Sequence, residues 1–260
     1  MDNRTNDSGP AVLTIAGLDP SGGAGLVADI RAFTAFGCFP TAVLTSITFQ
    51  NRLRVFGAMH QTAATVRAQV EPILLDLNVV AAKTGMLPTG EIVSEVARLF
   101  RETKLPAPVV DPVMVSTSGF DLIADDAFLR LKSELLVLSR VVTPNIPEAE
   151  RLTGLRITNT TDMWHAAQAI RELGVRAVLI KGGHLREQNE AVSREAIDIL
   201  DDGGEVTVFR GEWIYAAEVH GTGCTLSAAI AACLGRGMEL KASVSAAKKY
   251  VTENIRRQHY

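Results

Sequence analysis

The sequence has few cysteines, few aromatic side chains and no excess of basic residues, and each shortage excludes a class of protein. Three cysteines stand in 260 residues without a Cys-x-x-Cys pair, and the five histidines lie far apart. We therefore expect neither a disulfide framework nor a structural zinc site, and we expect a cytoplasmic protein. With 26 basic and 29 acidic residues, the net charge of −3 lacks the surplus that binding to nucleic acid requires.

Long hydrophobic runs are also missing. The polar start MDNRTNDSGP has neither the basic beginning nor the apolar run of a secretory signal. The apolar stretch 11–18 has eight residues, whereas a membrane-spanning helix needs about 20. We therefore expect no membrane contact. Hydrophobic residues still make up 47% of the chain, which is enough for a packed core.

After a flexible tail over residues 1–10, apolar runs alternate with helical patterns, and residues 11–260 are expected to form one domain. Strands are predicted over 12–16, 41–48, 79–84, 108–115, 137–143 and 175–181. One helix is predicted with Leu26, Ile30 and Phe33 on one face and an end at Gly37, and a second with apolar positions at Val66, Val70, Ile73 and Leu74. Five further helices are predicted over 92–100, 147–153, 161–173, 226–234 and 240–256. Pro72 must then be a first-turn residue or a break in its helix.

The last third of the chain changes pattern. The runs 196–200 and 205–209 flank a four-residue loop and predict a β-hairpin. The alternation before it predicts an α/β fold, with one doubly wound, mostly parallel sheet that is flanked by helices on both faces.

Ligands of such sheets bind beyond the carboxyl ends of the strands, so the loops there form the candidate site. In the loop HGTGCT (220–225), Gly221 and Gly223 permit a tight turn before a late helix. That helix is expected to begin near Cys224 or Thr225 and to turn its free N–H groups toward the loop. The loop is either an anion site or only a tight turn with a helix cap.

Several nucleotide-binding motifs are absent. No Gly-Lys dipeptide occurs, which excludes a Walker A loop, and the HRD and DFG motifs of protein kinases are missing. The glycine cluster 22–25 does not have the GxGxxG spacing of a dinucleotide-binding loop, and no acidic residue follows at the distance that loop requires.

Taken together, the loops resemble the ribokinase-like family, and within it the hydroxymethylpyrimidine/phosphomethylpyrimidine kinases of thiamine biosynthesis. The segments that carry the resemblance are AGLDPSGGAGLVAD (16–29), FQN (49–51), KTGML (83–87), DPVM (111–114), TPNIPEAE (143–150), IKGGH (180–184) and HGTGCTLSAA (220–229). They spread over more than 200 residues in the family's order.

The resemblance implies a homodimer that uses ATP and Mg²⁺. The γ-phosphoryl would pass to the hydroxymethyl of 4-amino-5-hydroxymethyl-2-methylpyrimidine and then to the resulting monophosphate. On the phosphoryl side it implies an anion hole of Gly221, Thr222, Gly223 and Cys224, ATP contacts from Lys181, Asn145 and Thr222, and Mg²⁺ held by Asp111 and Glu148. By residue type alone, Glu148 also suits the first turn of a helix, and Lys181 a solvated strand end.

On the acceptor side, the resemblance implies that Gln50 reads the aminopyrimidine edge, because a carboxamide offers a donor and an acceptor together. Asp29 would lie near the hydroxymethyl, although it also suits the first turn of a helix. Gly17, Met86 and Val113 would line the ring slot; Met86 equally suits an ordinary core position.

Cys224 occupies the position where sugar kinases of the superfamily carry an aspartate base. A helix N-terminus lowers the pKa of a thiol, so Cys224 is expected to be a base with a lowered pKa or, alternatively, a small buried residue. Cys233 is expected in the core.

Two alternatives remain for the function as a whole. A pyridoxine or pyridoxal kinase has the same fold and phosphorylates a hydroxymethyl on a pyridine, alone or as a second activity. A non-catalytic metabolite-binding protein is expected to lack the anion loop or the carboxylates, and this chain has both. The sequence departs from the family pattern at Thr117 and over 216–219, both near the implied nucleotide site.

Overall fold

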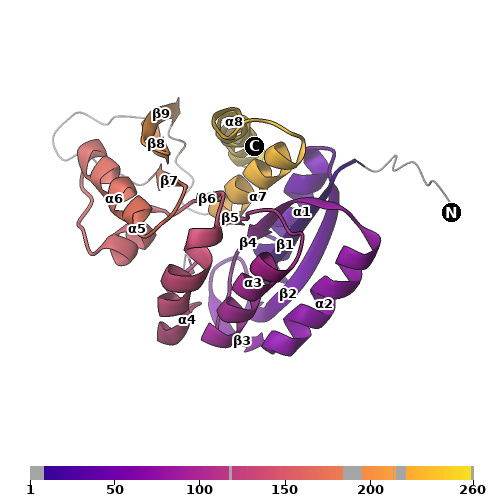
Figure 1. Cartoon of the computed structure of the whole chain (residues 1–260). Coiled ribbons are helices and arrows are strands. Elements are labelled where there is room, and N and C mark those ends of the chain that lie inside the picture. Colours follow the sequence, from indigo (N-terminus) through magenta and orange to yellow (C-terminus); the bar gives the residue numbers. More distant parts are fainter. Residues whose placement is uncertain (1–8, 117–118, 184–194, 213, 215–220, 259–260) are drawn as a thin grey trace.

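A nine-stranded sheet runs through the computed structural model, with the strand order β3-β2-β1-β4-β5-β6-β7-β8-β9. The structure describes residues 9–116, 119–183, 195–212, 214 and 221–258. The six strands from β2 to β7 are parallel, and β3, β8 and β9 join antiparallel at the two sides (Figure 1). The predicted doubly wound, mostly parallel sheet is confirmed.

The strands are β1 (Ala11–Leu18), β2 (Phe39–Gln50), β3 (Val55–His60), β4 (Val79–Thr84), β5 (Val109–Val110), β6 (Val141–Val142), β7 (Ala177–Gly182), β8 (Glu195–Asp202) and β9 (Glu205–Glu212). The helices are α1 (Gly25–Ala35), α2 (Ala63–Asp76), α3 (Gly90–Glu102), α4 (Asp125–Arg130), α5 (Ile146–Thr153), α6 (Thr160–Glu172), α7 (Thr222–Gly235) and α8 (Leu240–Gln258). A π-helical turn and a 3₁₀ turn follow α4 over 131–138.

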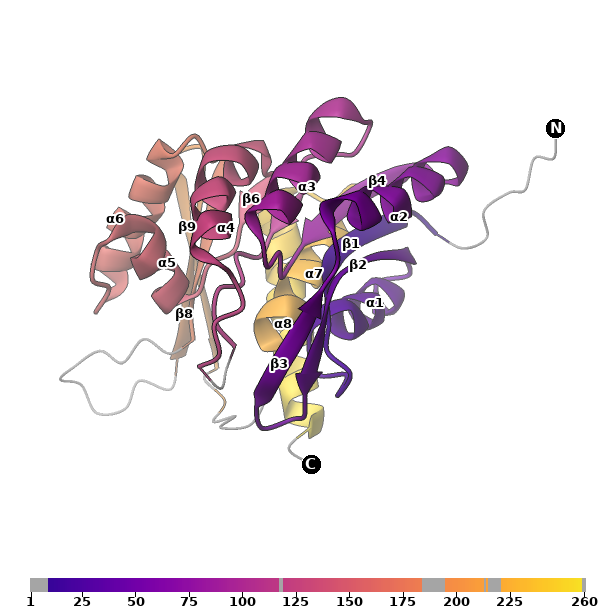
Figure 2. The ribbon, with the colours of Figure 1, turned by 90° about the horizontal axis from the view of Figure 1, so that it is seen from below.

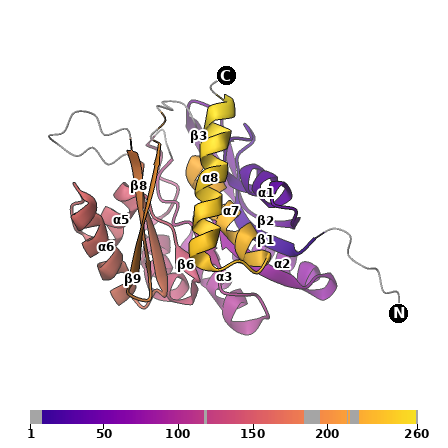
Figure 3. The same ribbon diagram turned by 90° about the horizontal axis from the view of Figure 1, so that it is seen from above.

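Helices cover both faces of the sheet, and a separate apolar core lies under each cover. Helices α2 to α6 pack on one face through residues such as Val66, Leu99 and Met163. Helices α1, α7 and α8 pack on the other face through Phe33 and Ile230 among others. Figure 3 shows the long α8 lying beside α7 and along the β8–β9 hairpin.

The chain reverses its winding at β1. From β1 it crosses to β2 through α1 on one face, and it enters β4 through α2 on the other face. Ligands of doubly wound sheets bind at such a switch point, outside the carboxyl ends of the strands. Figure 2 shows β2 and β3 as a long ribbon at this side of the sheet, so β2 delivers its last residue, Gln50, to the same edge.

Most predicted elements are confirmed, but two strands are much shorter than predicted. β5 pairs only over Val109–Val110, because Pro112 has no N–H to donate to a ladder and the chain turns, with the N–H of Val113 bonded to the carbonyl of Asp111. β6 pairs only at Val141–Val142, because the preceding residues form a 3₁₀ turn.

Smaller differences concern turns and exposure. The β8–β9 loop has two residues, Gly203 and Gly204, both at positive φ, and not four. Ile30, predicted on the buried face of α1, is 36% exposed. β3 was not predicted; it follows a turn in which the side chain of Asn51 accepts the N–H groups of Leu53 and Arg54.

No helix in the described part of the chain is long and apolar enough to cross a membrane. Residues 1–8 of the predicted tail lie outside the described residues, as do Thr117 and 216–219.

Pro72 lies inside α2, so the prediction that it is a first-turn residue or a break is wrong. A proline at this position removes the hydrogen bond to the carbonyl of Ala68 and its ring crowds that group. Both residues are on the exposed side, where water can solvate the carbonyl, so the helix continues at a cost.

Replacing Pro72 with alanine should therefore stabilise the protein. Removing an interior helix proline gains about 3 kcal/mol, and the freer unfolded chain takes back about 1 kcal/mol. The urea midpoint of Pro72→Ala should rise accordingly. Pro147→Ala is the matched control: Pro147 stands in the first turn of α5, where proline is favourable, and its loss should not stabilise. An unchanged or lowered midpoint for Pro72→Ala would contradict the argument.

Candidate active site

Helix α7 presents its N-terminus at the carboxyl edge of the sheet. It begins at Thr222, two to three residues before the predicted start near Cys224 or Thr225, and Gly221 is its N-cap at φ 84°. A side chain at Gly221 is impossible, because its Cβ would lie 1.9 Å from the carbonyl oxygen of Gly23. Gly221 thus packs directly on the glycine loop after β1, and the free N–H groups of the first turn of α7 follow it in the chain.

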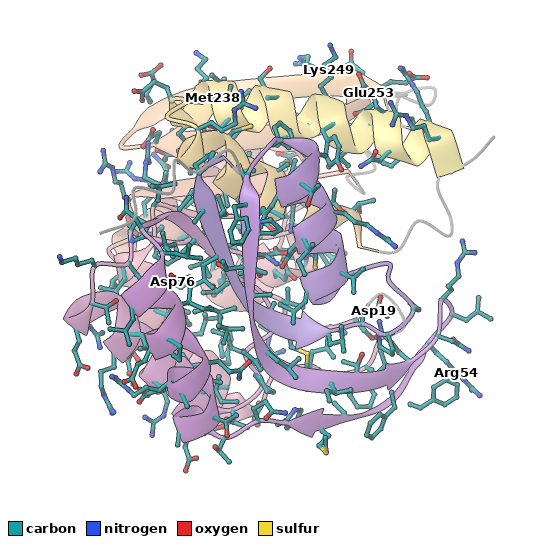
Figure 4. The ribbon with its side chains drawn as sticks, turned by 90° about the vertical axis from the view of Figure 1, so that its right-hand side faces the viewer. Asp19, Arg54, Asp76, Met238, Lys249 and Glu253 are labelled. Carbon is teal, nitrogen blue, oxygen red and sulfur yellow. The ribbon has the colours of Figure 1, made fainter. Side chains whose placement is uncertain are left out.

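The glycine loop is organised by Asp19, a residue that sequence reasoning missed. Its buried carboxylate accepts hydrogen bonds from the N–H and hydroxyl of Ser21 at 2.8 and 2.7 Å. It also accepts the N–H groups of Gly23 and Ala24 at 3.1 and 2.8 Å. Burial opposes the charge, yet these donors hold the pKa of Asp19 below its usual range. Figure 4 labels Asp19 beside the carboxyl end of β1.

Gln50, the predicted acceptor reader, is half-buried at the end of β2, and its side chain helps to lower the pKa of Asp19. The predicted ring-slot residues lie nearby. A Cβ on Gly17 would come within 3.0 Å of the sulfur of Met86, so the two residues are in contact. Met86 is buried and Val113 half-buried. The structure thus brings Gly17 and Met86 together. Gln50 lies at the end of β2, next to β1, and Val113 follows β5, next to β4.

Asp29 is fully buried and forms an ion pair with Lys83, a residue that we did not single out from the sequence. The ammonium of Lys83 lies 3.0 and 2.8 Å from the two carboxylate oxygens, and Thr14 donates its hydroxyl to Asp29 at 2.6 Å. Asp29 is the fifth residue of α1, so the alternative of a first-turn residue is wrong. Burial alone would lower the pKa of Lys83, but the neighbouring negative groups, led by Asp29, raise it, and the ammonium stays charged.

Asp111 and Lys181 form a second ion pair, with 3.0 Å between Nζ and Oδ1. Ser227 of α7 and Thr143 also donate their hydroxyls to Asp111, at 3.2 and 3.3 Å. Lys181 is 13% exposed, so it is not a solvated strand-end lysine, and a Cβ on Gly223 would lie 3.1 Å from its ammonium. The two lysines outweigh the effect of burial and keep the pKa of Asp111 low.

Glu148 stands in the first turn of α5, as its residue type suggested, and also lies near Lys181. With Asn145 it forms a capping box on α5: each side chain accepts the other residue's backbone N–H, at 2.9 and 2.8 Å. Its carboxylate also lies 4.0 Å from the ammonium of Lys181. Burial and the charge of Asp111 raise the pKa of Glu148 to about 7, despite the attraction of Lys181.

The prediction that the helix N-terminus lowers the pKa of Cys224 is wrong. Burial raises the pKa of this thiol to about 11, and the charges of Asp111 and Asp29 add to the rise. Lys83 and the N–H of Gly25 favour the thiolate and only partly offset the rise. Cys224 is therefore a neutral thiol at pH 7. Cys233 is fully buried in the core, as predicted.

The carboxylates suit a magnesium ion that shares its coordination with phosphates and water. Among the described residues, no group of three or more His, Cys, Asp or Glu side chains could hold a metal ion by itself. Mg²⁺ commonly takes one or two carboxylates and keeps waters or substrate phosphates as its other ligands. Asp111 and Glu148, which both approach Lys181, fit that donor set.

Comparison with known proteins identifies the family. A profile of the family described as phosphomethylpyrimidine kinase matches residues 19–260. The chain belongs to this family. It is 43% identical, over 95% of its length and 88% of the relative's, to a hydroxymethylpyrimidine/phosphomethylpyrimidine kinase from Streptomyces coelicolor.

Two solved structures are also similar. The phosphomethylpyrimidine kinase from Clostridium difficile 630 has a TM-score of 0.81 at 38% identity, covering 95% of this chain and 99% of that one. The pyridoxal kinase from Staphylococcus aureus, solved with AMP-PCP and pyridoxal, has a TM-score of 0.83 at 31% identity, covering 94% and 87%. The ribokinase-like fold and the kinase family predicted from the loop motifs are confirmed.

The raised pKa of Glu148 predicts a pH-dependent stability. Between pH 4.5 and about 7 the folded protein keeps a proton that the unfolded chain has lost, so the free energy of unfolding falls as pH rises through this window. Glu148→Gln retains an acceptor for the capping box but cannot titrate, so its free energy of unfolding should not fall in this window. In urea titrations from pH 4.5 to 7.5, the wild type should lose up to about 3 kcal/mol relative to Glu148→Gln. A constant difference would mean that the carboxyl is ionised throughout.

Proposed function

We propose that the protein catalyses ATP-dependent phosphorylation of 4-amino-5-hydroxymethyl-2-methylpyrimidine and then of its monophosphate, within thiamine biosynthesis. The observation that carries the proposal is the contact of Gly221 with Gly23, in which the N-terminus of α7 meets the glycine loop after β1, the strand that pairs with β2 and its last residue Gln50. In a member of the phosphomethylpyrimidine kinase family, that arrangement suits transfer of a phosphoryl group to a ring held by a carboxamide.

On the nucleotide side, the proposal assigns Lys181, Asn145 and Thr222 to ATP. The ammonium of Lys181 lies close to Gly223, where it would neutralise phosphate charge at the start of α7. The backbone N–H groups of Gly221, Thr222, Gly223 and Cys224 would stabilise the charge that develops on the transferring phosphoryl. The relative from Staphylococcus aureus was solved with the ATP analogue AMP-PCP, which supports ATP as the donor.

Asp111 and Glu148 are the residues that would hold Mg²⁺. When bound, the ion would neutralise phosphate charge and orient the triphosphate. Lys181 already neutralises part of the charge of both carboxylates, and Ser227 fixes the orientation of Asp111. Asp29 would act on the acceptor side through Lys83, because the ion pair occupies its carboxylate.

A pyridoxine or pyridoxal kinase activity, alone or as a second activity, is the alternative. The similarity to the pyridoxal kinase complex favours it, whereas Gln50 favours an aminopyrimidine. ATP consumption should be measured with hydroxymethylpyrimidine, its monophosphate, pyridoxal and ribose. Turnover of both pyrimidines supports the proposal, and turnover of pyridoxal or ribose alone would reject it.

The proposal includes the setting in which the enzyme works. The continuous sheet supports one ribokinase-like domain over residues 11–260, and the three free cysteines support a cytoplasmic setting. The homodimer is proposed from the resemblance to the family. Binding to nucleic acid or to a membrane has no part in it.

Cys224 should matter more for the first phosphorylation than for the second. An alcohol must lose a proton as it attacks, and a positioned base contributes about 10² to 10⁴-fold. The monophosphate, with a second pKa of about 6, is already mostly dianionic at neutral pH. Cys224→Ser should therefore lower turnover of the alcohol about a hundredfold or more, and turnover of the monophosphate far less.

The raised thiol pKa supplies an independent measurement. Because the pKa of Cys224 is about 11, the thiolate fraction and the rate of the alcohol step should both rise with pH above neutrality. Cys224→Ser should lose this rise. Equal losses in the two phosphorylations would show that Cys224 shapes the loop instead of taking the proton.

A further inference from the structure

Asp198 of β8 lies opposite Lys181 and holds the end of the strand that carries it. The two residues are direct partners in the antiparallel pair of β7 and β8, so their side chains leave the sheet on the same face. Asp198 is 6% exposed, and its carboxylate accepts the backbone N–H of Gly182 at 3.0 Å. Gly182 follows Lys181 directly and is the last residue of β7. The side chain of Asp198 is therefore bound to the backbone next to the lysine assigned to ATP.

Lys248 of α8 holds the other oxygen of this carboxylate. Its ammonium donates to Oδ2 of Asp198 and, at 3.2 Å, to the carbonyl of Ala196. Its side chain passes over β9 at Gly211, where a Cβ would lie 2.9 Å from Cε of Lys248. Figure 3 shows α8 running along this hairpin. Because each oxygen of the Asp198 carboxylate has its own donor, the group is held in one orientation.

The other end of the Lys181 side chain lies in the candidate site. Its ammonium lies 3.0 Å from Oδ1 of Asp111, and a Cβ on Gly223 would lie 3.1 Å from it. These contacts orient the ammonium, but the backbone of β7 decides where the side chain starts. A phosphate bound at the start of α7 would draw the ammonium away from the carboxylate, whereas the bond between Asp198 and Gly182 would stay.

We propose that Asp198 is a positioning residue for the nucleotide: it holds the backbone at Gly182 and so sets where the ammonium of Lys181 meets the phosphates of ATP. The inference rests on the proposed function, which assigns Lys181 to ATP. A displacement of about 1 Å in a group that positions a substrate can cost about a hundredfold in rate. Nucleotide binding therefore depends on the acceptor that the N–H of Gly182 meets, and not on the charge of Asp198.

Two nearly isosteric changes at Asp198 separate this role from the ion pair. Both are made together with Lys248→Met, so that neither leaves a buried ammonium without its partner. Asp198→Asn keeps an oxygen that can accept the N–H of Gly182, and Asp198→Leu removes it. The Kd of AMP-PCP with Mg²⁺, measured by calorimetry without an acceptor, should rise at least about tenfold for Asp198→Leu and stay within about threefold of Lys248→Met for Asp198→Asn. Equal Kd values for the two double variants would overturn the proposal.

Asp201→Leu is the matched control. Asp201 lies on the same strand, is 1% exposed, and accepts the backbone N–H of Gly204 at 2.8 Å and an N–H of Arg171 at 3.2 Å. It stands nearer to the β8–β9 turn, and its partner in β7 is Val178. Its loss should lower the urea midpoint but leave the Kd of AMP-PCP within about twofold of the wild type. A rise as large as that of Asp198→Leu would show that nucleotide binding follows the stability of the hairpin, and would also overturn the proposal.

The same measurements separate this inference from the proposed function. If the wild type phosphorylates pyridoxal but no pyrimidine, the proposed acceptor is wrong, and the role of Asp198 is still decided by the Kd values, which need no acceptor. If the wild type binds no AMP-PCP, both proposals fail. Should Asp198→Leu with Lys248→Met not fold, Asp198→Ala in the same background makes the comparison, and a Kd equal to that of Asp198→Asn rejects the inference.

Discussion

The ion pair of Lys83 and Asp29 is the constraint on which the charges of the site depend. Both side chains are fully buried, and burying either charge alone would cost several kcal/mol. The pair ties β4 to α1, and its field reaches Asp111 and Cys224. Lys181 then pairs with Asp111 and approaches Glu148, which its pKa of about 7 leaves partly protonated at neutral pH. Because each charge has an opposite neighbour, the removal of one leaves another uncompensated, and the cluster is retained or lost as a unit.

Backbone contacts between glycines connect this cluster to the acceptor side. Gly221 touches the carbonyl of Gly23, and a Cβ on Gly25 would lie 2.2 Å from the carbonyl of Gly17. Contacts this close leave no room for side chains, so the loop after β1 and the start of α7 have one relative position. The distance between acceptor and phosphoryl sites is thus set by backbone packing, which is stiffer than a contact between long side chains.

Local sequence predicted the elements whose signals are local, such as β4 with its β-branched run or α5 with Pro147 near its start and Gly154 at its end. It failed where pairing partners or solvent decide the outcome, as in the two-residue β5 and β6 and the helix that continues through Pro72. The loop motifs located most of the candidate site. Asp19 and Lys83 lie within these motifs, but residue type does not reveal their contacts. Asp19 accepts backbone N–H groups, and Lys83 pairs with a residue distant in sequence.

The thiol of Cys224 illustrates how two physical effects compete at one helix terminus. The N–H groups of the first turn favour an anion there, whereas burial penalises a thiolate, and burial dominates because the pKa rises to about 11. The outcome suits a site that must admit a triphosphate. A permanent thiolate at the third residue of α7 would occupy the same N–H groups and repel the phosphate charge. A neutral thiol leaves the helix terminus to the phosphoryl group, and it need ionise only when an acceptor hydroxyl has a proton to give up.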